Sequence, residues 1–314
     1  MGFFDRFYYG KAGKADFTAE DLPRNRFQLF LEVFRVRCWS LMRVNLMQVI
    51  FWVPLALWTY LNFIAIVSVD MAAADVMEQI QGFLQMYLLG LIPCIAITGP
   101  SSAAAAYVTR NWARDQHSFV WSDFKDAFKD NWKQALLVSF ITGALPSVVY
   151  FGYNFYGAMA AQNFIFFIPQ ALITIIAMLW VLMLPLLYPL MAGYELKFTH
   201  LLRNALLLAM ARLPHMIGIR LLMAIPMIVL VVGMYFFFNI WIIFGVMVYY
   251  LLMGLALSRL VYASVANGFF DKYINVNIEG AEINRGLYKD EFADDDDEED
   301  EDSEDEEEDE DDEE

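Results

Sequence analysis

Residues 93–135 read PCIAITGPSSAAAAYVTRNWARDQHSFVWSDFKDAFKDNWKQA, an apolar run followed by a stretch of aromatic and charged residues. In the second half, four large aromatic residues recur at i, i+3, i+7 and i+11, which puts them on one face of a helix. They are Trp121, Phe124, Phe128 and Trp132. Lysines at i+4 spacing, among them Lys125 and Lys129, alternate with aspartates. The hydrocarbon core of a bilayer would not solvate those charges, and water would not solvate the aromatic face. The pattern therefore predicts a helix at 119–134 on the membrane surface or against a partner.

The first half of this stretch is interrupted by helix-breaking residues and then by four consecutive alanines. Two prolines interrupt the fourth apolar run in a similar way. The residues concerned are Pro93, Gly99, Pro100, Ala103, Ala104, Pro185 and Pro189. Two interpretations stay open at this stage. A broken helix can expose backbone groups to a substrate, as in transporters. Alternatively, kinks and small residues let neighbouring helices pack closely.

Composition places the chain among membrane proteins. Its 314 residues are 59% hydrophobic and 19% charged. The net charge of −17 comes from residues 294–314, which contain 20 of the 38 acidic residues and no Lys or Arg. We expect this acidic tail to be disordered, because it has almost nothing to bury. The two cysteines and three histidines have no disulfide or metal-ligand spacing.

The hydropathy pattern predicts an all-α, polytopic protein with six transmembrane helices, each at least as long as the ~20 residues that cross a bilayer. The predicted spans are 44–68, 83–108, 135–156, 164–191, 216–238 and 241–263. Residues 1–43 form a lead-in that includes an interfacial helix from residue 27, and residues 266–293 form a polar segment after the membrane domain of 44–265. All 21 Lys and Arg residues lie in the N-terminal segment, around 109–134, around 192–220 or after the middle of the last span. Because cytoplasmic loops collect such residues, both termini are predicted to be cytoplasmic.

Two arginines lie inside the predicted spans. Arg220 and Arg259 each stand a few residues from a cytoplasmic end. A long side chain can reach the interface from such a position, so we interpret both as snorkelling residues.

Three sequence blocks resemble one family. The blocks GPSSAAAAYVTRN at 99–111 and FVWSDFKDAFKDNWKQA at 119–135 are similar to recurring patterns of the YesL-like family of bacterial membrane proteins, a domain of unknown function. The block NALLLAMARLP at 204–214 resembles a third. The order Ile97-Thr98, the longer 69–82 loop and the acidic tail depart from the family pattern. Genes of this family tend to lie beside carbohydrate ABC-transporter and sensor-kinase genes in Gram-positive bacteria, which implies an accessory role at the plasma membrane.

Three classes of function remain. The first is an accessory or scaffold protein that docks a partner, such as an ABC-transporter or sensor-kinase component, through the 119–134 helix. The second is a transporter or channel for a small uncharged solute, since no charged residue or histidine lies in the middle third of any span. The third is a membrane enzyme, and the sequence shows no nucleophile elbow, zinc ligand set or paired carboxylates that would support it. We therefore expect no enzyme activity, no cofactor and no nucleic-acid partner, with the lipid bilayer as the surroundings. The sequence leaves the oligomeric state open.

Overall fold

The computed structural model describes residues 22–237 and 239–288, and these form helices joined by short connections, with no strand among them. In chain order the helices are α2 (Arg26–Val67), α3 (Val76–Ala96), α4 (Thr98–Trp112), α5 (Val120–Ala160), α6 (Phe167–Gly193), α7 (Phe198–Ala211), α8 (Leu213–Phe237), α9 (Ile240–Tyr249) and α10 (Leu255–Tyr273). A single 3₁₀ turn, Phe164–Phe166, precedes α6, a π-helical turn, Tyr250–Gly254, joins α9 to α10, and a second 3₁₀ turn, Asn275–Asn277, follows α10. The acidic tail at 294–314 and most of the predicted lead-in lie outside the described residues.

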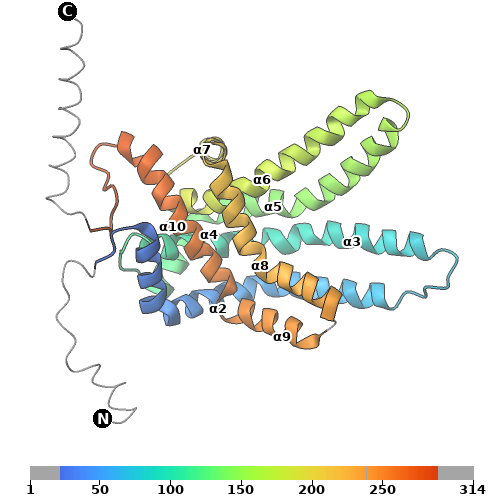
Figure 1. The fold of residues 1–314 in the computed structure, drawn as a ribbon, viewed down its shortest axis with the longest axis horizontal. Coiled ribbons are helices and arrows are strands. Elements are labelled where there is room, and N and C mark those ends of the chain that lie inside the picture. The colour runs from blue at the N-terminus through green and yellow to red at the C-terminus, as the bar shows by residue number, and fades with distance from the viewer. Residues whose placement is uncertain (1–21, 238, 289–314) are drawn as a thin grey trace, which may run out of the picture.

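Three helical hairpins extend from a common base (Figure 1): α2–α3, α5–α6 and α8–α9. The tips of the first two diverge, and the described chain begins and ends at the opposite end of the molecule. We call this opposite end the base. It consists of α4, α7, α10, the first parts of α2 and α5, and the last part of α6. Six helical segments in the described chain are long and apolar enough to cross a membrane, which confirms the predicted fold class.

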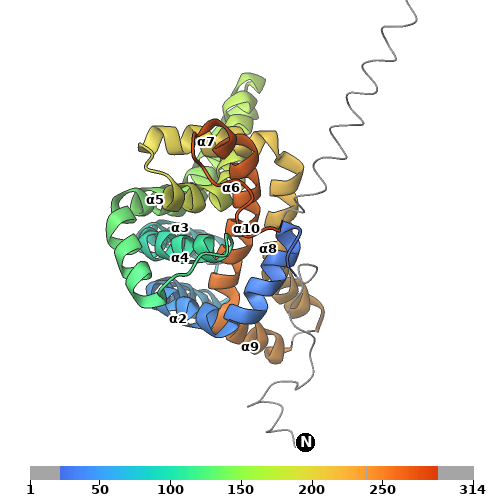
Figure 2. The same cartoon turned by 90° about the vertical axis from the view of Figure 1, so that its left-hand side faces the viewer.

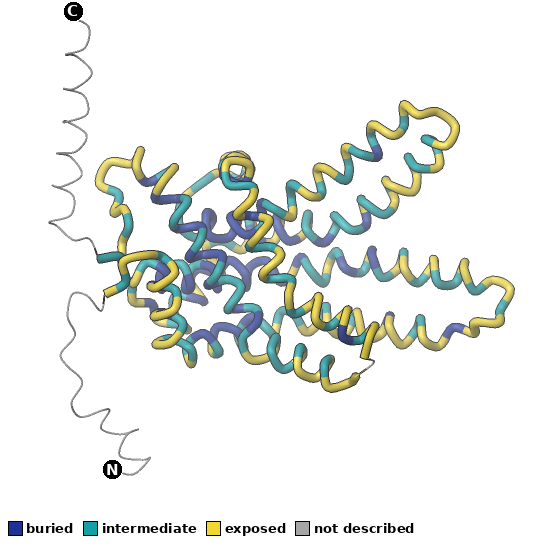
Figure 3. The backbone as a smooth tube through the Cα atoms, in the orientation of Figure 1, coloured by how far each residue is buried: buried dark blue, intermediate teal, exposed yellow. Residues whose placement is uncertain are grey.

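Burial is concentrated in the base (Figure 3), whereas the hairpins consist mostly of exposed and intermediate residues, with few buried ones. In the most apolar part of each spanning segment only 6% to 28% of the residues are buried. Exposed leucine, isoleucine and phenylalanine on this scale require an apolar solvent, because water would not tolerate so large an apolar surface. The hairpins are therefore the part of the protein that the lipid bilayer surrounds.

Helix α4 lies at the centre of the base. Figure 2, which views the molecule from the base, shows it among the surrounding helices, and it contacts α2, α5, α6 and α10. Nearly all of its residues are buried, including the run Ala103–Ala106. Ala103 and Ala106 belong to one buried cluster with α6 and α7, and Ala104 and Ala105 to another with α2 and α10. Methyl side chains let four helices approach α4 at once, which larger side chains would prevent.

The boundaries of several predicted segments differ from those observed. The predicted span 83–108 is two helices, since α3 ends at Ala96 and α4 begins at Thr98. Pro100 has no N–H to donate to the carbonyl of Ala96, so the helix cannot continue there. Proline is tolerated in the first turn of the new helix. Conversely, the predicted surface helix and the third span are one continuous helix, α5.

Two other predicted segments also run together. The predicted interfacial helix and first span form α2, which is kinked at Arg37, where the backbone leaves the helical region (φ −105°, ψ 16°). The last predicted span continues beyond residue 263 as α10. Asn239 separates α8 from α9, as the sequence predicted, and its side chain accepts a hydrogen bond from the backbone N–H of Trp241.

Candidate functional site

The first third of α5 is fixed at its start by a local capping arrangement. The Asp123 carboxylate accepts hydrogen bonds from the Ser118 hydroxyl (2.6 Å) and from the backbone N–H of Phe119 (2.9 Å). A negative charge in the first turn also interacts favourably with the helix dipole. The aromatic segment therefore begins at a defined residue and in a defined direction.

The structure separates the four aromatic residues of this segment into two pairs. Phe124 is only 4% exposed and packs in the base beside Ala127. Phe128 is half-buried, and its ring centroid lies 5.3 Å from that of Phe51 on α2. By contrast, Trp121 is 70% and Trp132 is 46% exposed.

The division follows from which side of α5 faces α4. That side is centred on residues 124, 127 and 135, and the two tryptophans lie at its edge. Phe124 therefore cannot anchor a partner in this conformation, whereas Trp121 and Trp132 are accessible. Lys125 and Lys129 are exposed beside them.

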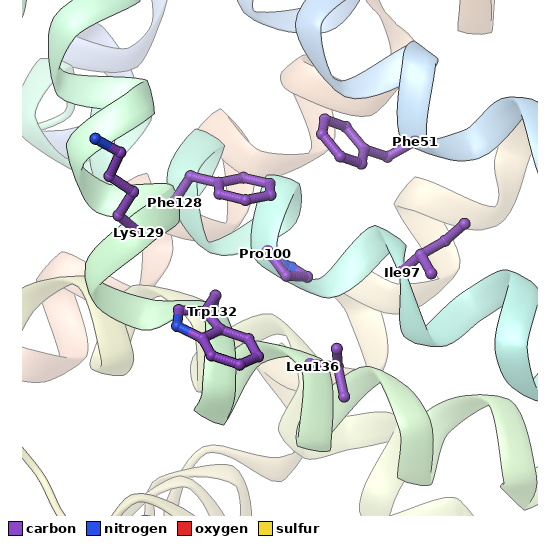
Figure 4. Close-up of a pocket in the computed structure, with 7 residues that line it drawn as sticks. All are labelled: Phe51, Ile97, Pro100, Phe128, Lys129, Trp132 and Leu136. Atoms are coloured by element: carbon purple, nitrogen blue, oxygen red, sulfur yellow. The ribbon is translucent and has the colours of Figure 1, made fainter.

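An apolar groove of about 530 Å³ lies between α2, the α3–α4 break and α5 (Figure 4). Three predicted docking residues and one residue of the predicted helix break meet there. The lining residues are Phe51, Ile97, Pro100, Phe128, Lys129, Trp132 and Leu136. Figure 4 shows the Lys129 amino group pointing away from Pro100, so the interior of the groove is apolar. Such a surface can hold an aliphatic chain or an apolar side chain, with one amine at its edge.

The helix-break residues pack closely instead of exposing their backbone. A Cβ atom built on Gly99 would lie 2.2 Å from the carbonyl oxygen of Ala135, so α4 touches the backbone of α5 at this point. Pro185 and Pro189 are both buried, and α6 continues through them without a break. Pro93 likewise lies inside α3. These contacts favour the interpretation that the small and kinking residues allow close packing.

Tyr188 links three helices in this core. Its hydroxyl lies 2.6 Å from the Ser139 hydroxyl, so a buried hydrogen bond joins α6 to α5. The residue is buried with the α4 alanines in the same cluster. A satisfied buried hydrogen bond of this kind fixes one arrangement of the two helices.

A second polar cluster joins the two ends of the described chain. Arg26, at the start of α2, forms an ion pair with the buried Asp271 of α10. Asn275 donates to the same carboxylate, and the Tyr194 hydroxyl donates to Asn275 Oδ1 at 2.7 Å. Burial raises the pKa of the Tyr194 hydroxyl, although the nearby Arg110 opposes that shift. The backbone N–H of Tyr288 also donates to the Pro23 carbonyl (2.9 Å), so these contacts hold the two ends of the described chain together.

Two residues of these sites were not singled out in the sequence: Phe51 in the groove and Asp271 in the polar cluster. Neither carried a signal, since their importance depends on partners distant in the chain. In the described ranges, no group of three or more His, Cys, Asp or Glu side chains could hold a metal ion.

The groove, the α3–α4 break and the first part of α5 lie in one stretch of sequence, and this stretch was compared with known families. Residues 41–153 match the family described as "Protein of unknown function, DUF624". The match includes the blocks at 99–111 and 119–135, so the resemblance expected from them is confirmed over this range. The DUF624 region ends before α6, so the block at 204–214 lies outside it. No curated protein and no solved structure matches the chain.

Proposed function

We propose that this protein is a membrane accessory or scaffold protein that docks a partner through the first third of α5. The observation that carries the proposal is the pair Phe119 and Trp121, each 70% exposed at the start of a helix whose next turn is anchored by Phe124. Both rings stand beside Asp123, Lys125 and other charges, which exclude this segment from the hydrocarbon core. Large exposed aromatic side chains on a rigid element are typical anchors of protein interfaces.

The continuity of α5 gives docking a route to the membrane part of the protein. The helix is continuous from Val120 to Ala160 although it changes direction beside Trp132 (Figure 4), so the docking segment and a membrane span belong to one helix. Gln134 further ties it to the base, because its amide donates to the Leu196 carbonyl at 3.0 Å. Helix α4 fills the centre of the base, and this packing favours a scaffold over a transporter.

We further propose that the protein lies in a bacterial plasma membrane with the base and both termini in the cytosol. The connections at the hairpin tips, residues 68–75, 161–163 and 239, contain no Lys or Arg, whereas the base carries many. With this orientation the first third of α5 faces the cytosol. The implied link to carbohydrate ABC transport then suggests the ATPase subunit as the partner. Its docking clefts would receive the two aromatic rings, and the charges around them would lie at the rim.

Two tryptophan variants test the docking proposal. Trp121→Ala should weaken partner binding by about 30-fold, which corresponds to the roughly 2 kcal/mol typical of an anchor residue. Trp241→Ala is the matched control, because this side chain is 72% exposed but lies at the start of α9, away from the base. Both variants should keep the wild-type melting temperature. The measurement is quantitative recovery of ABC-transporter ATPase subunits with the purified protein.

Binding and melting temperature, measured on the same variants, also distinguish docking from burial of Trp121 in the lipid interface. If Trp121 rests in the lipid interface, its replacement will lower the melting temperature and leave the recovery of the ATPase subunit unchanged. That outcome would refute docking through this segment. Lys125→Ala and Lys129→Ala should have smaller effects, because exposed charges at the edge of an interface mainly change association rates and salt dependence.

A further inference from the structure

Two arginines, one on α8 and one on α10, contact side chains of the bundle, and Tyr262 of α10 interacts with both of them. The guanidinium carbon of Arg259, on α10, lies 4.6 Å from the centre of the Tyr188 ring, and its Nη2 donates to the Ser102 hydroxyl at 3.0 Å. Arg220, on α8, donates from Nη1 to the Tyr262 hydroxyl at 3.3 Å. Both arginines therefore contact side chains of the helical bundle, Ser102 and Tyr188 in the case of Arg259 and Tyr262 in the case of Arg220.

Among the described residues, neither Arg220 nor Arg259 forms an ion pair with a carboxylate. The titratable groups that interact electrostatically with Arg259 are Tyr188, Tyr262 and Arg220, two neutral phenols and a second cation. The acid that follows on the same helix, Asp271, is twelve residues away, about 18 Å along the axis, and pairs with Arg26. A partly buried guanidinium is stabilised when an opposite charge lies beside it. The pair therefore favours an anion.

The hydrogen-bonding capacity of the pair also remains largely unused. A guanidinium has five N–H donors. Within the described residues, Arg259 uses one of them on Ser102, and Arg220 uses one on Tyr262. Both residues are partly exposed, so a ligand can reach them. Two planar guanidiniums suit a phosphate group, which accepts paired hydrogen bonds from such side chains.

The backbone near Arg259 contains a π-helical turn that is stabilised by hydrogen bonds from another helix. The π-helical turn Tyr250–Gly254 ends five residues before Arg259. Asn45 supports it with four hydrogen bonds, donating to the Tyr250 and Leu251 carbonyls and accepting from the Leu255 and Ala256 N–H groups (2.8–3.0 Å). Such turns occur frequently at functional sites.

The position of the pair corresponds to the headgroup level of a bilayer. Arg220 lies seventeen residues before the end of α8, about 25 Å from the hairpin tip, and the hydrocarbon core is about 30 Å thick. Helix α8 packs loosely, with only Met216 and Gly233 buried, so a lipid-borne ligand can approach its flank. We propose that Arg220 and Arg259 bind the phosphate group of an anionic ligand, carried either by a lipid headgroup or by a free phosphate.

Native mass spectrometry of the full chain in an uncharged detergent tests this site. The probes are dioctanoyl phosphatidylglycerol, inorganic phosphate and, as a lipid without phosphate, dioctanoylglycerol. We expect phosphate-bearing probes to bind at least tenfold more tightly than dioctanoylglycerol. Arg259→Gln and Arg220→Gln should each remove that preference. The control Arg203→Gln, an exposed arginine on α7, should preserve it.

Each outcome has a defined meaning. Binding of phosphatidylglycerol alone assigns the site to a lipid headgroup, and equal binding of inorganic phosphate assigns it to a free anion. The proposal is overturned if neither binds, if dioctanoylglycerol binds as tightly, or if both glutamine variants bind like the wild type. Arg220→Gln is the second variant should Arg259→Gln fail to fold, and Arg259→Lys should bind with intermediate affinity, because lysine keeps the charge without the paired donors.

Discussion

Replacing Gly99 with alanine should force two central helices apart. A Cβ atom at this position would lie 2.2 Å from the Ala135 carbonyl oxygen, 2.7 Å from the carbonyl carbon and 2.7 Å from the Ser139 hydroxyl. The hydroxyl can rotate away, but the carbonyl belongs to the backbone of α5 and cannot. Because ordinary carbon contacts begin near 3.5 Å, α5 would have to move by about 1 Å. That movement would disturb the buried hydrogen bond between Ser139 and Tyr188.

The magnitude follows from these contacts. Overpacking a close contact costs about 1–3 kcal/mol, and losing one buried hydrogen bond costs about 0.5–1.5 kcal/mol. Alanine returns about 1 kcal/mol through its higher helix propensity. The Gly99→Ala variant should therefore be less stable by about 0.5–3.5 kcal/mol. The matched control is Gly268→Ala in α10, where a new Cβ meets no atom within 4 Å, and this variant should be more stable by about 0.5–1 kcal/mol.

The assay is reversible unfolding of both variants in mixed micelles, with the denaturing detergent as the titrant and helical content as the signal. Opposite signs for the two glycines would support a direct backbone contact between α4 and α5. If Gly99→Ala were as stable as the wild type, α4 would not touch α5 at Ala135. That result would contradict the placement of α4 at the centre of the base, and with it the groove beside Pro100.

Three further predictions follow from the same contacts. Asn45→Ala should destabilise the protein by about 2–6 kcal/mol, since it removes four hydrogen bonds worth about 0.5–1.5 kcal/mol each; an unchanged midpoint of unfolding would contradict its supporting role. Asp271→Ala should cost up to about 3 kcal/mol because the partly buried Arg26 loses its carboxylate partner and keeps only the Arg285 carbonyl and Asn284 Oδ1 as acceptors, and the double variant Asp271→Leu with Arg26→Met should recover much of that loss in the same assay. A reporter active only outside the cell should be active when fused after Ala74 and silent after Arg203, and the reverse pattern would invalidate the proposed orientation.

The sequence alone was sufficient for the fold class and the number of spans. Each span contains a long, predominantly apolar run, and hydrocarbon solvates such a run whatever its neighbours are. The helix breaks at Asn239 and Pro100 could also be recognised in the sequence, because capping by Asn239 and the missing N–H of Pro100 act within one helical turn. The family resemblance rested on two blocks of adjacent residues, and the match at 41–153 covers both. All of these features depend on short stretches of chain.

Only the tertiary structure decided which faces are covered and which side chains meet. Phe124 and Trp121 belong to the same aromatic face by periodicity, yet one is in the core and the other is exposed, because α4 approaches just one edge of that face. Arg220 and Arg259 looked like independent interfacial residues, although packing of α8 near α10 brings them together. Asp271 gains its partner from the other end of the described chain. Such pairings are set by helix packing between segments distant in sequence, and residue spacing within one segment cannot encode them.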